Sequence, residues 1–185
     1  MNRRAFIVSI GATSIAPTLA QSASIDRIAI FVTSEDNTAS VTDVDRFTAR
    51  LGGAFLRTHH YSIVDRARLA AVIHEQGFSN SMYADPKTAA ALGKIAGASR
   101  LLHVTLSVTG ERSDGAMMTI VKFTADATYS LVGVDSARII SEGTAEGEDE
   151  KDYARGSPVT DIASIRRNAL DACCDDVMQQ IVSPS

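Results

Sequence analysis

The hydrophobic pattern of the first part of the chain predicts a strand, a helix and a second strand. Residues 25–33 are apolar on both faces, which is typical of a central strand covered on both sides. A helix follows from Thr42, and its buried face is formed by Val44, Phe47, Leu51 and Phe55. Residues 61–64 form the second strand, so the spacing predicts a parallel βαβ unit with a right-handed crossover.

Two adjacent glycines, Gly52 and Gly53, lie inside this predicted helix. Each glycine lowers the helix propensity by about 1 kcal/mol relative to alanine. A close approach of the helix to the sheet would explain why they are tolerated, and we expect such an approach here.

Two short helices with clear boundary signals come next. Asp65 is placed to cap a helix that ends at Gly77. Asp85 caps the following helix, Pro86 takes its first position and Gly97 ends it. The apolar stripe of this second helix consists of Leu92, Ile95 and Ala96.

The second half of the chain predicts an antiparallel meander and a final helix. Alternating apolar and polar residues predict three strands, over residues 100–109, 117–131 and 138–145. A polar turn over 110–115 joins the first two strands. The charged segment 147–157 is interpreted as a mobile loop, either plain solvated surface or a docking segment. The final helix runs over 160–182 and buries a face formed by Ile162, Ile165, Ala169, Cys173 and Val177.

Together these elements predict the α/β class, on the border with α+β, with a mixed five-stranded sheet and helices packed on it. The length of 185 residues indicates one domain, which we place over residues 23–185.

The first 22 residues have the pattern of a cleaved secretory signal peptide. Arg3 and Arg4 form a basic start, an apolar run covers residues 5–19, and small residues follow at 18–20. The arginine pair fits the twin-arginine route, and the general secretory route stays open. The run is too short for a stable membrane span, and without a cysteine near the cleavage region no lipid anchor is expected. The sequence therefore predicts a soluble periplasmic protein.

Composition and cysteine content narrow the choice of partners. The net charge of -4 argues against nucleic acid, because binding phosphates requires a basic surface. Cys173 and Cys174 are adjacent, and their side chains point about 100° apart in a helix, so they do not form a disulfide with each other. They are interpreted as two small buried residues, and a cross-link between two chains is the alternative.

No catalytic, nucleotide-binding or metal-binding motif is present in the sequence. The four histidines, His59, His60, His74 and His103, are not spaced as zinc ligands. Of these, His59, His60 and His103 are interpreted as surface or capping residues. We therefore expect no enzymatic activity, no cofactor and no metal.

The stretch from residue 64 to residue 98 carries a resemblance. Its spaced positions are Val64-Asp65-Arg66, Leu69, Val72, Glu75-Gln76, Asp85, Leu92-Gly93-Lys94 and Gly97-Ala98. This pattern resembles the CsgG-like family of curli production assembly and transport components, which is related to the penicillin-binding-protein activator LpoB. The resemblance implies an anticodon-binding-like fold similar to the N-terminal domain of TolB, and relatives that act by binding and assembly. It departs from the family in lacking the cysteine of a lipoprotein.

The function expected from the sequence is that of a non-catalytic periplasmic accessory or assembly protein that binds a protein of the cell envelope. Alternatives are a ring-forming subunit of a curli-type outer-membrane secretion apparatus, and a small ligand-binding domain or enzyme. A homo-oligomer is compatible with the first two functions. Candidate partner-binding residues are the polar positions and the interhelix loop of the resembling stretch, namely Glu75, Gln76, Ser81, Met82, Tyr83 and Lys94.

Overall fold

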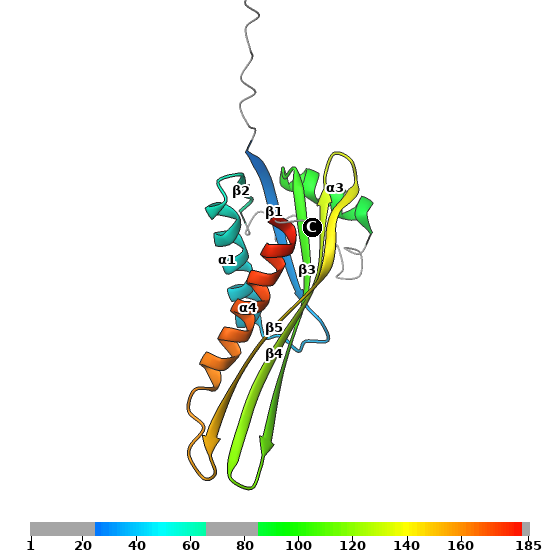
Figure 1. Ribbon diagram of the computed structural model, residues 1–185. Coiled ribbons are helices and arrows are strands. Elements are labelled where there is room, and N and C mark those ends of the chain that lie inside the picture. Colours follow the sequence, from blue (N-terminus) through cyan, green and yellow to red (C-terminus); the bar gives the residue numbers. More distant parts are fainter. Residues whose placement is uncertain (1–24, 66–84, 183–185) are drawn as a thin grey trace, which may run out of the picture.

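A mixed five-stranded sheet with helices on both faces forms the centre of the structure (Figure 1). The computed structural model describes residues 25–65 and 85–182. The strand order is β2-β1-β3-β4-β5, with β1 parallel to β2 and β3, and with β3, β4 and β5 antiparallel to one another. The predicted fold class is confirmed. The predicted signal peptide and the helix expected after Asp65 lie outside the described residues.

The N-terminal part forms the predicted βαβ unit. Strand β1 covers Asp26–Ser34, helix α1 covers Val41–Arg57 and strand β2 covers Tyr61–Ile63. The helix begins one residue earlier than predicted, because Ser40 caps it and forms reciprocal hydrogen bonds with Asp43.

Helix α3, Pro86–Ala96, packs on the opposite face of the sheet from α1 (Figure 1). Its predicted boundaries are confirmed, since Asp85 accepts a hydrogen bond from the backbone N–H of Thr88 and Gly97 is left-handed with φ 73°. Its predicted apolar stripe is partly wrong. Leu92 and Ala96 are buried, whereas Ile95 is 45% exposed, because only one narrow side of this short helix meets the sheet.

The three strands of the meander are longer than the sequence predicts. Strand β3 covers Arg100–Asp114, β4 covers Met118–Gly133 and β5 covers Arg138–Ala154. Most of the predicted turn over 110–115 is therefore strand. Gly110 pairs with Phe123 in this ladder, and the Phe123 ring occupies the space that a β-carbon at residue 110 would need. Figure 1 shows that β3, β4 and β5 extend side by side past the ends of α1 and α3.

The charged segment after residue 147 is not the predicted mobile loop. Residues 147–154 continue β5 and pair in register with β4. Their alternation explains the outcome: Glu148, Glu150 and Asp152 turn to water while Gly147 and Tyr153 face the interior. Acidic residues have a low strand propensity, but the burial of every second side chain stabilises the strand in this segment.

Helix α4, Ile162–Val182, lies beside α1 on the same face of the sheet (Figure 1). Its predicted buried residues are confirmed except for Ile162, which is exposed at the first turn. Gly147 of β5 allows the helix to come close, because a β-carbon there would stand 2.2 Å from the backbone nitrogen of Cys173. This contact fixes α4 against the outer strand of the sheet.

Helices α1 and α4 are also joined by charged side chains. Arg166 of α4 donates hydrogen bonds to both carboxylate oxygens of Asp43, and Arg50 pairs with Asp171 and Asp175. Burial alone would raise the pKa of Asp43, but hydrogen bonds from Arg166 and Ser40 outweigh it and the pKa is lowered. Asp43 is thus a buried anion with a dedicated cationic partner.

Candidate functional site

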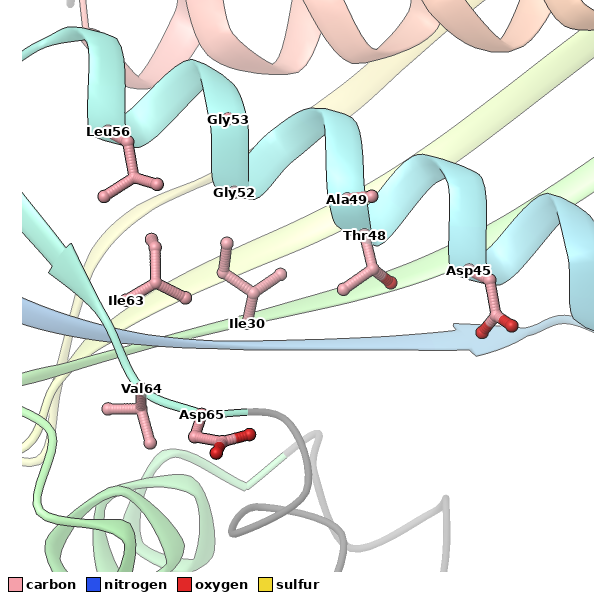
Figure 2. A pocket seen from close by; sticks show the side chains of 10 residues that line it. All are labelled: Ile30, Asp45, Thr48, Ala49, Gly52, Gly53, Leu56, Ile63, Val64 and Asp65. Carbon is pink, nitrogen blue, oxygen red and sulfur yellow. The ribbon is translucent and has the colours of Figure 1, made fainter.

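A groove runs between α1 and the edge of the sheet formed by β1 and β2 (Figure 2). Its volume is about 410 Å³. The floor and end walls are apolar side chains of the sheet and helix, among them Ile30, Ile63 and Leu56, and two carboxylates, Asp45 and Asp65, border it. We call this surface the α1 groove.

The two glycines of α1 form part of the wall of this groove (Figure 2). The prediction that α1 closely approaches the sheet at these positions is wrong. A β-carbon at Gly52 would meet no atom within 4 Å, and one at Gly53 would meet only the Arg57 side chain at 3.6 Å. The glycines therefore do not relieve an internal contact; they leave space on the surface.

The groove lies where the short strand β2 ends. Tyr61–Ile63 pairs with Asp26–Ile28, and the next residue, Val64, is buried in the core on the other face of the sheet. Figure 2 shows the Ile63 and Val64 side chains on opposite sides of β1. None of the residues in the ranges 25–65 and 85–182 continues β2 into the space under α1.

The structure describes one of the six residues that the sequence nominated for binding, and that residue does not line the groove. Glu75, Gln76, Ser81, Met82 and Tyr83 lie outside the described residues. Lys94 is exposed on α3, on the opposite face of the sheet from α1. The signal that could have identified the groove was the glycine pair in a helix, which sequence reasoning assigned to internal packing.

His103 differs from the surface or capping position that the sequence suggested. It is half-buried on β3, stacks on Phe31 at 5.8 Å between ring centroids, and lies 3.3 Å from the Thr33 hydroxyl. Burial lowers its pKa to about 4, so the ring is neutral at neutral pH. The histidine belongs to the packing of the sheet.

The interpretation of the two cysteines as buried residues is confirmed. Both thiols are free and fully covered, and burial raises the pKa of each to about 12. A protonated, covered thiol is a poor nucleophile.

Two searches for other kinds of site were limited to the residues that the structure describes. Over residues 25–65 and 85–182 there is no group of three or more metal-ligating side chains. None of the helices in the same ranges is both long and apolar enough to cross a membrane.

The described residues arrange two helices on one face of the sheet and one on the other, which defines an α/β domain with a surface groove. The sequence profile of the family described as "Curli production assembly/transport component CsgG" matches residues 28–152, about two thirds of the chain. The protein belongs to this family. The predicted resemblance is therefore confirmed.

Solved structures of other bacterial proteins also match this chain. Lipoprotein GNA1162 from Neisseria meningitidis matches with a TM-score of 0.48 and 17% identity, covering 85% of this chain and 98% of that one. The LpoB C-terminal domain from Salmonella enterica matches with a TM-score of 0.41 and 14% identity, covering 66% and 82%. A minor lipoprotein from Acinetobacter baumannii gives a TM-score of 0.49 at 10% identity, covering 85% and 90%. A comparison with curated proteins found no match.

Proposed function

We propose that this protein is a non-catalytic accessory or assembly protein of the cell envelope that acts in the periplasm by binding another protein. The observation that carries the proposal is the family match over residues 28–152, because the family is described as an assembly and transport component. The signal-peptide pattern of residues 1–22 supports export. The α1 groove supports binding as the mode of action, since apolar concave surfaces are common binding sites.

A photo-cross-linking amino acid placed at exposed positions of the full-length chain tests this function in the cells that make it. The positions are Leu56 at the groove, Met117 at the end of the β3–β4 hairpin and Ala172 on α4. We expect a cross-linked protein of defined mass at Leu56 and none at Ala172. Absence of cross-linked protein at all three positions, together with a small molecule that copurifies with the chain, would support a ligand-binding domain or enzyme instead.

A ring-forming subunit of a secretion apparatus is the second candidate, because the family description also includes transport. The mass of the purified mature protein in solution separates the two. A monomer or dimer supports the accessory function, and an assembly of many copies supports the ring.

A further inference from the structure

We propose that the α1 groove takes an extended segment of a partner protein, which adds to the sheet as a further strand beside β1. This inference rests on the protein-binding function proposed above and specifies the form in which the partner binds. Strand addition at a sheet edge is a general mode of peptide recognition in which main-chain hydrogen bonds supply affinity.

The backbone of β1 indicates which of its groups face the groove. The N–H of Asp26 donates to the His60 carbonyl at 3.0 Å, and the Ile28 carbonyl accepts from the Val64 N–H at 2.9 Å. The residues of β1 with even numbers therefore turn both backbone groups toward β2. Residues with odd numbers turn theirs toward β3, as the Arg27 carbonyl shows by accepting from the Ser99 N–H.

This alternation continues past the end of β2. Strand β1 runs on to Ser34 and is paired with β3 up to that residue. Ile30 and Val32 therefore direct an N–H and a carbonyl each toward the groove side. Within residues 25–65 and 85–182, no strand pairs with them there. Backbone groups at such an edge are a template for another strand.

The space above this edge fits the side chains of an added strand. A strand about 4.8 Å from β1 turns every second side chain toward the helix. That side chain would enter the groove between Ile30 and Ile63. Gly52 of α1 lies above this point and has no side chain to fill the space (Figure 2). The 410 Å³ volume lies within the usual range of ligand sites, roughly 300–1,000 Å³.

The chemistry of the lining selects an apolar residue at this position. Leu56 is 51% exposed at the groove, and no basic residue is found among the ten described residues that line it. Most of these described residues are apolar, and covering their exposed surface would stabilise a complex. The expected occupant is a segment in which an aliphatic residue alternates with residues that face away from α1.

Peptides provide a probe that does not require the natural partner. A phage-displayed library of linear peptides, roughly eight residues long, is selected against the full-length protein, and the best binder is synthesised. Each residue of that peptide is then N-methylated in turn. Removing a pairing N–H should weaken binding by roughly tenfold or more. We expect losses at every second residue only, because alternate N–H groups point away from β1.

Variants of the protein locate the bound peptide. Gly52→Leu fills the groove, and Ala49→Leu does so from a neighbouring position, should the first variant fold poorly. Ala172→Leu is the matched control, since it adds the same bulk to an exposed site on α4. We expect roughly tenfold weaker binding for either groove variant and unchanged binding for the control. Amide exchange at Ile30 and Val32 should slow when the peptide binds.

Three results would overturn the inference: no peptide is enriched, binding is indifferent to both groove variants, or the N-methyl scan shows no period of two. These failures are distinct from failure of the proposed function. A partner cross-linked at Met117 but not at Leu56 would keep the function and remove the groove from it. No cross-linked partner at any position would remove both.

Discussion

The two edges of the sheet differ in how far other groups cover their backbone N–H and carbonyl groups. Strand β5, which is 17 residues long, forms one edge and lies beside α4. The Thr144 carbonyl accepts a hydrogen bond from Gln180 at 2.9 Å, and the Glu146 N–H donates to Asp176 at 3.3 Å. Side chains of α4 thus satisfy backbone groups that another chain would otherwise use.

Charge protects the same edge further along. Exposed carboxylates recur at alternate positions of β5, namely Glu142, Glu146, Glu148, Glu150 and Asp152. Charged side chains on an edge strand oppose pairing with a second strand.

The edge of β1 beyond Ile28 has neither kind of protection among the described residues. Ile30 and Val32 are apolar, and the helix above them carries glycines where side chains would otherwise fill the space. The β5 edge is covered in two separate ways, and the strand addition proposed above would account for the part of the β1 edge that the described residues leave uncovered. Four substitutions test this contrast and the attachment of α4 on which it depends.

The largest effect is expected at Gly147. A β-carbon there would stand 2.2 Å from the Cys173 nitrogen and 2.3 Å from the Ala169 carbonyl oxygen, so Gly147→Ala must push α4 away from β5. We expect a loss of roughly 3 kcal/mol in the free energy of unfolding, at the upper end for overpacking. Urea denaturation measures it, and an unchanged midpoint would mean that α4 is not held at this edge.

Asp43→Asn tests the ion pair that joins α1 to α4. Removing the charge that accepts the Arg166 hydrogen bonds should lower the unfolding free energy by roughly 2 kcal/mol at neutral pH. Because the folded pKa of Asp43 is below the unfolded value, its stabilisation is present above the unfolded pKa and is lost as pH falls through the folded pKa. The difference between wild type and variant should therefore shrink below about pH 4. A difference that is constant from pH 7 to pH 2 would contradict this role.

Gln180→Ala removes a cap from the β5 edge. The Thr144 carbonyl loses its donor but gains access to water, so we expect a loss of about 1 kcal/mol. Denaturation measures the loss, and sedimentation checks whether the uncapped edge promotes self-association. Gln179→Ala, at an exposed neighbouring position on α4, serves as the control and should leave both measurements unchanged. Equal losses in the two variants would mean that the cap does not stabilise the edge.

The smallest effect, with the opposite sign, is expected for Gly52→Ala. The added β-carbon meets no atom within 4 Å, and alanine is the better helix former, so stability should rise by up to about 1 kcal/mol. A thermal melt records the change. A lower melting temperature would mean that the groove is not open space, and the contrast between the two edges would fail.

The sequence was sufficient to predict the structure wherever a local pattern is compatible with one structure only. Asp85, Pro86 and Gly97 mark the ends of α3 by capping chemistry alone, and the spacing of Phe47 and Leu51 defined the buried face of α1. Those signals depend on backbone geometry within a few residues, so no tertiary information was needed.

The sequence was insufficient to predict the structure where the same residues are compatible with two environments. The acidic run after Gly147 is compatible with a loop and with an edge strand, and pairing with β4 decides between them. A glycine pair in a helix can mark a close internal contact or an open surface. The open space around Gly52 and Gly53 decides in favour of the surface.

The burial of the two cysteines makes the β5 edge observable by chemical labelling. With a pKa of about 12, each thiol is ionised roughly a thousandfold less often than an exposed cysteine at neutral pH. The Cys173 Sγ donates to the Ala145 carbonyl, directly beside the Gly147 contact. An alkylating reagent can therefore react at Cys173 only after α4 has lifted from β5. The rate of Cys173 alkylation thus reports how often that edge opens, without the need to introduce a cysteine.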